Sequence, residues 1–200
     1  MVEQGSIEWL HMRLGKLTAS RMADVLATTK SGPSASRKNY LAQLVAERMT
    51  GQPAESFNNA AMQWGTDNEP LARAEYEMIK DIMVDQVDFV DHPTIEWCGA
   101  SPDGLCGDNG LVEIKCPNTA THIDYILAGV TPSKYHPQMA LQLLCTGREW
   151  CDFVSYDPRM PDKHKLFIAR FTPGAEYLEK VESAAVEFLA DVQDVINKLG

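Results

Sequence analysis

Two carboxylates and one ammonium group are spaced in a way that lets them act together. They belong to Asp103, Glu113 and Lys115. Because side chains alternate along a strand, Glu113 and Lys115 share one face, while Val112 and Ile114 point into the core. A hairpin that closes midway between Asp103 and Glu113, at a turn signal rich in Gly, Asp and Asn, would bring the two carboxylates side by side. The sequence therefore predicts that these charged groups converge on one small patch.

This grouping favours chemistry at a divalent cation. Two carboxylates held close together repel each other unless a cation lies between them. Mg²⁺ and Mn²⁺ take oxygen ligands and retain water, which leaves room for a phosphate oxygen and an attacking water. A nearby lysine can hold or help to deprotonate that water, or stabilise charge on the phosphate. The pattern is coherent with metal-assisted phosphodiester hydrolysis, and the same residues taken alone also fit a surface ion pair on an exposed strand edge.

The overall composition is that of a globular chain with a substantial core. Of the 200 residues, 44% are hydrophobic and 23% are charged, which fits one domain over residues 1–200 and excludes a disordered tail or a disulfide-stapled scaffold. The net charge of −10 argues against a generic nucleic-acid coat. The sequence shows no apolar run near the ~20 residues of a membrane span, and no signal-peptide pattern at its start. With five cysteines, an odd number, we expect reduced thiols and a cytoplasmic protein without a membrane partner.

The elements around the motif follow from hydrophobic periodicity and capping residues. The pattern predicts helices that begin near residues 18–20 and 36, and a third over about 61–80. Strand patterns follow at 82–90, 94–98, 111–116, 150–156 and 166–171, with helices near 119–128, 133–144 and 173–199. This order predicts an α/β (α+β) domain with a central mixed β-sheet flanked by helices. Its parts are N-terminal helices over about 9–80, a sheet core over about 82–171 and a C-terminal helix over about 173–199.

Several blocks of this sequence resemble phage lambda exonuclease and its YqaJ-type viral recombinase relatives, the alkaline exonuclease family. Ser101-Pro102-Asp103-Gly104-Leu105-Cys106 and Glu113-Ile114-Lys115-Cys116-Pro117 resemble the active-site motifs of that family. The other matching blocks are an opening motif at Trp9, Arg13 to Gly15 and Leu17 to Ser20, a helix motif at Trp64-Gly65 and Glu69, a helix glutamine at Gln138, and Tyr156-Asp157-Pro158-Arg159-Met160. These blocks occur in order and span roughly residues 9–160, so the resemblance covers most of the chain.

The resemblance implies a restriction-endonuclease-like core that works as a metal-dependent exonuclease. Such enzymes degrade one strand of double-stranded DNA from its 5′ end, release mononucleotides and leave 3′ single-stranded overhangs. Family members form ring-shaped homotrimers, and their partner is a single-strand annealing protein encoded by the same phage. The resemblance therefore implies double-stranded DNA ends, a homotrimer and that annealing protein as partners, and the cytoplasm of a bacterial host as location. It also implies Mg²⁺, or Mn²⁺, as cofactor, with two ions per active site.

The resemblance further implies which residues hold the metal. Asp103 and Glu113 would ligate the ions together with the backbone carbonyl of Ile114. Lys115 would serve the attacking water. Glu69, from the Trp-Gly helix, would lie near the ions and ligate them directly or through water. The resemblance thus adds one acid from a distant helix to the set that the hairpin pattern predicts.

A pocket for the 5′-phosphate is also implied, formed by Arg13, Ser20, Ser101 and Gln138. Arginine gives a bidentate and permanently charged clamp, and a serine near a helix N-terminus adds donors where the helix dipole favours an anion. A bound terminal phosphate fixes the distance from the DNA end to the scissile bond. The family's second helix glutamine stands two residues after the first, whereas this sequence has Ala140 there and its next glutamine at Gln142. The role of Gln142 therefore stays open.

Other residues are candidate contacts to the DNA. Met62 stands where the resemblance implies an apolar wedge that separates the terminal base pair, and it also fits ordinary core packing. Lys30, Arg37 and Lys38 are candidate contacts to the DNA backbone, or simply part of a solvated surface. Two other functions stay open: a structure-specific endonuclease of the same fold, and a DNA-end-binding subunit without catalytic turnover.

Overall fold

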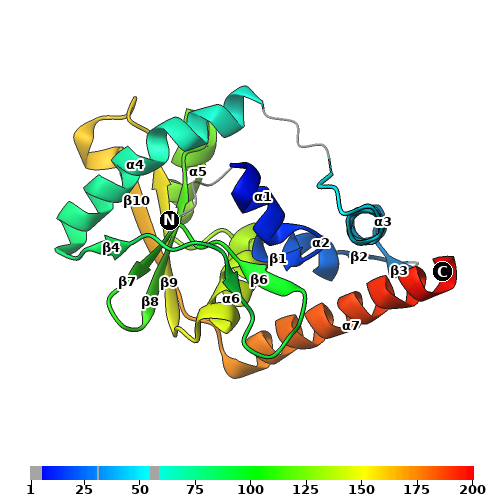
Figure 1. Cartoon of the computed structure of the whole chain (residues 1–200). Coiled ribbons are helices and arrows are strands. Elements are labelled where there is room, and N and C mark those ends of the chain that lie inside the picture. Colours follow the sequence, from blue (N-terminus) through cyan, green and yellow to red (C-terminus); the bar gives the residue numbers. More distant parts are fainter. Residues whose placement is uncertain (1–5, 31, 55–58) are drawn as a thin grey trace.

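The computed structural model of the protein describes residues 6–30, 32–54 and 59–200. The expectation that the chain starts without a signal peptide concerns the first five residues, which lie outside this part. Within it, none of the helices combines the length and the apolar character needed to cross a bilayer. Helices lie around a central sheet, and a long helix runs out from it to the C-terminus (Figure 1).

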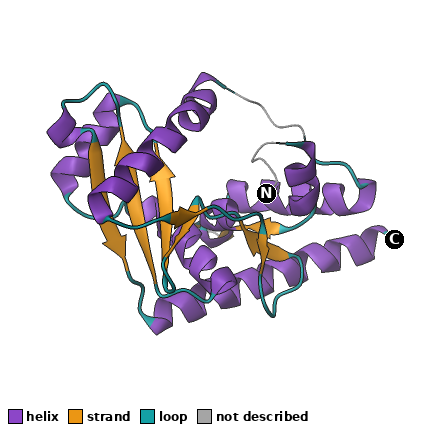
Figure 2. Ribbon diagram, turned by 60° about the vertical axis from the view of Figure 1, so that its left-hand side comes forward, coloured by secondary structure: helices purple, strands orange, loops and turns teal. Residues whose placement is uncertain are grey.

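The central sheet has five strands in the order β10-β9-β8-β7-β4 (Figure 2). Their bounds are β4 (Val84–Asp85), β7 (Gly104–Cys106), β8 (Gly110–Lys115), β9 (Trp150–Tyr156) and β10 (Leu166–Phe171). β8 and β9 run parallel, with Lys115 opposite Ser155, and the other neighbours are antiparallel. Since parallel strands are normally covered on both faces, β8 lies in the interior and is buried from Gly110 to Ile114.

Two smaller sheets lie beside the central one. The first has the order β1-β6-β5, with β1 (Leu17–Thr18), β5 (Val90–Asp91) and β6 (Cys98–Ala100). The second is the hairpin of β2 (Thr28–Thr29) and β3 (Gly32–Pro33). Because β6 pairs with β1 and leads directly into the loop that contains Asp103, the first small sheet ties the N-terminal region to the hairpin of β7 and β8.

The helices of the described part are α1 (Ile7–Arg13), α2 (Met22–Leu26), α3 (Ala35–Thr50), α4 (Ala60–Lys80), α5 (Thr119–Ala128), α6 (His136–Thr146) and α7 (Ala175–Leu199), with 3₁₀ turns at Ala19–Arg21, Ser133–Tyr135 and Asp162–His164. α4 packs on β8, β9 and β10, and α7 packs along α3 and α6 (Figure 1). The C-terminus of α3 is formed by Gly51, whose φ of 67° is a left-handed value that glycine adopts at little cost.

The two faces of β8 belong to two different hydrophobic clusters. Val112 and Ile114 pack with Tyr76 of α4, whereas Leu111 belongs to the cluster that includes α6 and α7. Glu113 shares the face of Leu111 and is fully buried against α6. The predicted alternation is therefore confirmed, and the alternative of a surface ion pair is wrong for Glu113, because its carboxylate lies inside the protein.

Most of the predicted elements are confirmed, and two stretches differ. The strands at 150–156 and 166–171 are β9 and β10, and the mixed α/β class is as predicted. The strand predicted over 82–90 is instead two short strands, because β4 pairs with β7 in the central sheet whereas β5 pairs with β6 in the other. The strand predicted at 94–98 starts only at Cys98, after Trp97 turns the chain with a positive φ of 63°.

The helix predicted to begin near residues 18–20 also differs in its first turn. The chain enters a 3₁₀ turn there, and Thr18 makes no side-chain capping hydrogen bond. The hydroxyls of Thr18 and Ser20 instead lie 3.3 Å from each other. The hydroxyl of Ser20 also accepts a hydrogen bond from Arg13 of α1, in the site described next.

Candidate active site

The hairpin of β7 and β8 brings the first two acids of the motif together. Gly104 pairs with Val112, so the next positions outward, Asp103 and Glu113, stand opposite each other. Oδ2 of Asp103 accepts a hydrogen bond of 2.7 Å from the backbone N–H of Ile114. The hairpin register predicted from the sequence is confirmed, and it holds the first acid against the strand that carries the second.

The carboxylate of Glu113 is surrounded by hydrogen-bond donors. Its Oε1 accepts from Gln138 Nε2 and its Oε2 accepts from Gln142 Nε2, both at 2.6 Å. Lys115 Nζ forms an ion pair with Oε1. Because a buried carboxylate is costly unless it is paired and hydrogen-bonded, the two amides of α6 and the lysine of β8 together make this buried charge tolerable.

Asp103, in contrast, lies in surroundings that disfavour its charge. Burial and then the negative charge of Glu113 raise the pKa of Asp103 well above its usual value, although Lys115 acts in the opposite direction. Burial acts to lower the pKa of Lys115, but the carboxylates of Glu113 and Asp103 outweigh it and raise this pKa above the ordinary value. The lysine therefore stays protonated, and its single positive charge faces two carboxyl groups.

Helix α4 brings a third acid toward the hairpin. Glu69 is partly buried and forms an ion pair with Arg73, one turn further along α4. Burial raises the pKa of Glu69, while the positive charges of Arg73 and Lys115 act to lower it. In the described part of the chain, no three acidic, histidine or cysteine side chains meet as a ready-made metal cluster. The acids that lie together are Asp103 and Glu113, and Glu69 is coupled to them by charge.

A second polar group, which we call the Arg13 group, consists of Arg13, Ser20, Ser101 and Trp9. Arg13 Nη1 donates to Ser101 Oγ at 3.4 Å, and Nη2 donates to Ser20 Oγ at 3.3 Å. The guanidinium carbon lies 3.9 Å from the centre of the Trp9 ring, and Trp9 Nε1 donates to Ser101 Oγ at 3.2 Å. Burial lowers the pKa of Arg13 to about 10, so it is still a cation at neutral pH. This cation is held by hydroxyls and an aromatic face, which suits it to bind an anion.

Beside the Arg13 group lies a cavity of about 350 Å³. Arg13, Trp9 and Thr18 line it, and Met62 lines it from the first turn of α4. Met62 is 53% exposed, so the alternative of ordinary core packing is wrong for this residue. Its role as a wedge stays a prediction, made for a side chain that does reach the cavity of the Arg13 group.

Gln138 has a different neighbour from the one that the resemblance implies. Its Nε2 bonds to Glu113, and the hydrogen bonds of the described residues do not connect it to the Arg13 group. Gln142 is fully buried and bonds to the other oxygen of the same carboxylate. Residues four apart on a helix project from the same face, so the spacing of the two glutamines is the signal by which Gln142 could have been found. Their common acceptor becomes visible only in the fold.

The basic residues proposed for the DNA backbone have different surroundings. Lys30, in the turn between β2 and β3, and Lys38, on α3, are exposed. Arg37 forms an ion pair of 2.8 Å with Asp191 of α7 and lies over the ring of Phe188. The guanidinium of Arg37 is therefore already engaged in holding α3 against α7, whereas the two lysines extend into solvent.

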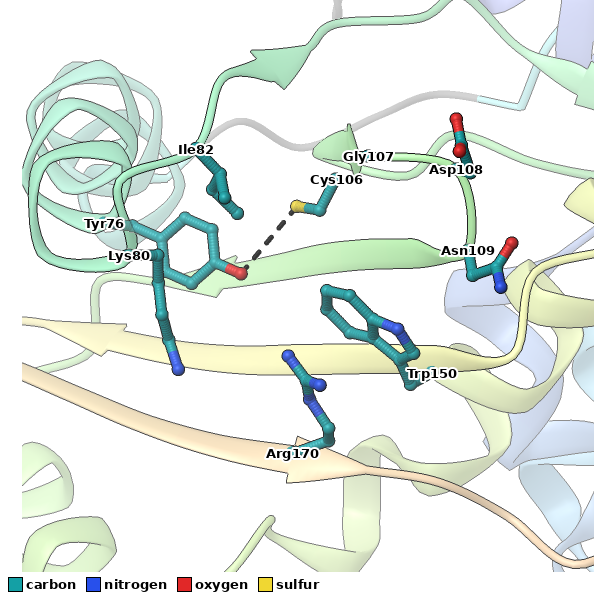
Figure 3. Close-up of a pocket in the computed structure, with 9 residues that line it drawn as sticks. All are labelled: Tyr76, Lys80, Ile82, Cys106, Gly107, Asp108, Asn109, Trp150 and Arg170. Atoms are coloured by element: carbon teal, nitrogen blue, oxygen red, sulfur yellow. Dashed lines mark hydrogen bonds between the residues drawn. The ribbon is translucent and has the colours of Figure 1, made fainter.

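A second cavity, of about 390 Å³, lies at the opposite end of β8. It is lined by Tyr76, Lys80, Ile82, Cys106, Gly107, Asp108, Asn109, Trp150 and Arg170 (Figure 3). Asp152 is 1% exposed there and accepts hydrogen bonds from Arg170 Nε at 2.7 Å, Arg170 Nη2 at 3.0 Å and the Tyr76 hydroxyl at 2.8 Å. The guanidinium carbon of Arg170 lies 3.5 Å from the centre of the Trp150 ring. Here the buried acid has its own cation, and none of the predicted site residues takes part.

Comparisons with known proteins agree with this fold. The chain is similar to an alkaline exonuclease, LHK-Exo, from Laribacter hongkongensis, whose structure is also known in complex with dAMP. The two are 49% identical with a TM-score of 0.90, over 97% of this chain and 96% of that one. A phage-related exonuclease from Haemophilus somnus, 12% identical, matches 92% of this chain and 96% of its own with a TM-score of 0.72. That second likeness concerns the fold, which is the lambda-exonuclease-like arrangement around a restriction-endonuclease-like core.

Sequence comparison gives the family directly. The uncharacterized protein R354 of Acanthamoeba polyphaga mimivirus is 24% identical over 208 residues, which cover 96% of this chain and 36% of that protein. The chain thus spans about a third of the length of this curated relative. The family model for the YqaJ-like viral recombinase domain matches residues 8–149, a stretch that contains the hairpin acids, Glu69, both glutamines and the whole Arg13 group. This chain therefore belongs to the YqaJ-like viral recombinase domain family.

Proposed function

We propose that this protein is a metal-dependent DNA exonuclease. It would remove mononucleotides from one strand of a duplex end in the 5′→3′ direction and leave a 3′ single-stranded overhang for recombination by strand annealing. The observation that carries the proposal is the cluster of Asp103, Lys115 and the buried Glu113. Arg13, which suits an anion, bonds to Ser101, two residues before Asp103. The similarity to an alkaline exonuclease supports this activity, and the dAMP complex of that relative supports a mononucleotide product.

The donor set fits a divalent cation, and we infer Mg²⁺, or Mn²⁺, with two ions per active site. Burial and then the nearby carboxylate of Glu113 raise the pKa of Asp103, and a cation between the two acids would favour their charged forms. Asp103 and Glu113 would supply carboxylate oxygens and Ile114 its backbone carbonyl, while Glu69 would contribute directly or through water. A bound ion of this kind polarises the scissile phosphate and lowers the pKa of an attacking water.

Lys115 would hold the attacking water and neutralise charge that develops on the phosphate. Because its pKa is raised, it is a donor of hydrogen bonds at neutral pH and not a base. Gln138 and Gln142 would keep the carboxylate of Glu113 in one orientation, since each amide binds one of its oxygens. Lys115 would thus act on the water and the phosphate, whereas the two glutamines would act on Glu113.

The Arg13 group would bind the terminal 5′-phosphate of the strand that is digested. Gln138 is the further member that the family resemblance implies. A phosphate fixed there sets the distance to the scissile bond, so that each cut releases one nucleotide and creates the next terminal phosphate. Met62, at the same cavity, would separate the terminal base pair. Lys30, Arg37 and Lys38 would contact the DNA backbone, although Arg37 would first have to release Asp191.

A digest of end-labelled linear duplex tests this function. The substrates are identical duplexes with 5′-phosphate or 5′-hydroxyl ends, and a closed circle of the same DNA is the control. We expect labelled mononucleotides from the 5′-phosphorylated end in the presence of Mg²⁺. Nicking of the closed circle would indicate the endonuclease instead. DNA binding without release of nucleotides, in Mg²⁺ or Mn²⁺, would indicate a non-catalytic end-binding subunit.

The substitution Arg13→Ala tests the phosphate pocket separately. Wild-type protein is expected to prefer the phosphorylated end, and the variant should cut both kinds of end at one low rate, because the clamp for the terminal charge is lost. The measurement is the ratio of initial rates on the two substrates. Wild-type protein that cuts both ends equally would contradict the assignment of the Arg13 group.

The family resemblance also leads us to propose the assembly. The active form would be a homotrimer around the DNA, it would work with a single-strand annealing protein of the same phage, and it would act in the cytoplasm of the bacterial host. Light scattering tests the first of these points, because a trimer has three times the mass of the chain. A monomer that digests DNA processively would contradict it.

A further inference from the structure

One motif of the sequence has no role in the function proposed above: the segment Tyr156-Asp157-Pro158-Arg159-Met160. It begins at Tyr156, the last residue of β9, and β9 runs parallel to β8 with Ser155 opposite Lys115. The carboxyl ends of neighbouring parallel strands meet at the same edge of a sheet. The segment therefore leaves the sheet at the edge where Lys115 stands.

Arg159 is held in this segment by a buried acid. Asp157 is fully buried, and its Oδ1 accepts hydrogen bonds from the backbone N–H of Arg159 at 3.0 Å and from Arg159 Nε at 2.7 Å. Its Oδ2 accepts from Arg159 Nη2 at 3.0 Å and from Thr119 Oγ1 at 2.6 Å. One edge of the guanidinium is thus fixed by the carboxylate, and the arginine side chain is still 48% exposed.

Two further contacts locate this guanidinium beside the candidate active site. Its carbon lies 4.5 Å from the centre of the ring of Trp64, on the same helix as Glu69. Arg159 Nη2 also donates, at 3.5 Å, to the carbonyl of Pro117, two residues after Lys115. The indole N–H of Trp64 is buried and has no hydrogen-bond partner among the described residues. Arg159 is therefore held in place beside the Trp64 indole, whose N–H is still free, within the described part of the chain, to donate a hydrogen bond.

The unit of Arg170, Asp152 and Trp150 is built in the same way at the other end of the sheet. Its acid is 1% exposed, its arginine side chain is 49% exposed, and the guanidinium lies over a tryptophan ring. It faces the cavity of Figure 3, which none of the predicted site residues lines. Arg159 and Arg170 thus have the same kind of partners, a buried aspartate and a tryptophan ring. Of these two arginines, Arg159 is the one that lies at the sheet edge where Lys115 stands.

We propose that Arg159 binds a backbone phosphate of the DNA substrate other than the one that is cut, which rests on the DNA exonuclease function proposed above. The planar fork of arginine matches a phosphate, and a guanidinium already fixed by a carboxylate loses little freedom on binding. Arg13 contacts Ser101, just before the hairpin of β7 and β8, and Arg159 contacts Pro117, just after it. The two arginines therefore stand at the open end of the hairpin that carries Asp103 and Glu113, one beside each of its strands.

The test compares Arg159→Gln with the matched control Arg170→Gln. In each variant the new amide can still donate to the buried aspartate, while the positive charge is lost. Binding to a 5′-phosphorylated duplex end is measured in EDTA, where the DNA is not cut, at several salt concentrations. We expect Arg159→Gln to weaken binding on the order of tenfold and to reduce the slope of log K against log salt by about 0.9, the value for one phosphate contact. Arg170→Gln is expected to change neither quantity.

A scan with neutral methylphosphonate linkages locates the phosphate. In wild-type protein, one linkage near the end should weaken binding by the same factor as Arg159→Gln, and in the variant that linkage should have no additional effect. Arg159→Lys should restore part of the binding, because it retains the charge without the fork. Equal binding by Arg159→Gln and Arg170→Gln, or linkage effects that are the same in variant and wild type, would overturn the proposal. If the wild-type protein binds ends but releases no nucleotide, the proposed function fails, and the binding comparison still decides the role of Arg159.

Discussion

Glu113 and Asp152 are buried carboxylates on neighbouring strands of one sheet, and their surroundings are opposite in charge. Asp152 accepts two hydrogen bonds from Arg170 and one from the hydroxyl of Tyr76, and Lys80 lies 3.9 Å away. One buried negative charge therefore meets two positive groups. This arrangement neutralises the acid from within the chain, as is usual for a buried ion pair that serves the fold.

On the other face of the sheet, one residue further along β8, two adjacent acids share one lysine. Glu113 has Lys115 and two amides, and Asp103 next to it has a backbone N–H and a strongly raised pKa. Glu69 adds further negative charge from α4. The chain neutralises the buried Asp152 with its own cations, but it leaves the pair of Asp103 and Glu113 with a single lysine. A divalent cation bound to this pair would reduce the repulsion between the two carboxylates.

The largest effect is expected from Asp103→Asn. The amide oxygen can still accept the hydrogen bond from Ile114, but the charge that would hold a cation is lost, so cleavage should fall by at least about 10²–10³-fold. The measurement is single-turnover release of a 5′-labelled nucleotide at saturating Mg²⁺. Asp152→Asn is the control, and its folded fraction should cut at the wild-type rate. Equal losses in the two variants would remove the distinction between the two acids.

For the stability of the metal-free protein, in contrast to cleavage, substitution of Asp152 should have the larger effect and substitution of Asp103 the smaller one. Asp152→Ala leaves the hydroxyl of Tyr76 and the guanidinium of Arg170 without their acceptor, which we expect to lower the free energy of unfolding by about 3 kcal/mol. Asp103→Asn should be neutral or stabilising at pH 7, because the raised pKa of Asp103 means that its charge is unfavourable in the folded state. Urea unfolding in EDTA measures both. If Asp103→Asn lowered the free energy of unfolding as much as Asp152→Ala does, Asp103 would be a structural acid like Asp152.

Acid titration should show how much the bonded pair of Asp157 and Arg159 contributes to the free energy of unfolding. Burial acts to raise the pKa of Asp157, but the hydrogen bonds from Arg159 and Thr119 outweigh it and lower this pKa to about 2. A folded-state pKa below the unfolded value stabilises the protein above about pH 4, and this stabilisation of about 2 kcal/mol is lost as the pH falls toward 2. The free energy of unfolding between pH 5 and pH 2 measures it. The same pH slope in Asp157→Asn would assign the loss to other carboxylates.

The smallest effect sharpens the role of the glutamines. Gln142→Leu removes one of the two amides that orient Glu113, and we expect the affinity for Mn²⁺ to fall about tenfold, as is typical for residues that position a metal ligand. Leu141→Met, a substitution at a buried neighbour on α6, is the control and should leave this affinity unchanged. Electron paramagnetic resonance of Mn²⁺ measures binding without DNA. A lower melting temperature with unchanged Mn²⁺ affinity would limit Gln142 to a structural role.

Much of the candidate site could be predicted because it is local in sequence. Asp103 and Glu113 meet across one short hairpin, and alternation along a single strand puts Lys115 on the face of Glu113. The strands β9 and β10 also follow from short-range patterns. The stretch over 82–90 could not be predicted in this way, because its two ends pair with strands of different sheets and its own pattern does not contain those partners.

The sequence by itself determined the hairpin of acids and lysine, the order of the elements and the family resemblance, since each depends on residues near one another in the chain or on matching blocks. Only the tertiary structure decided that α6 directs two amides at Glu113, that Arg37 is engaged by Asp191, and that Arg159 lies over Trp64. These contacts join segments 25 to 154 residues apart. Their partners are selected by the packing of helices on sheet faces, which no local pattern of side chains specifies.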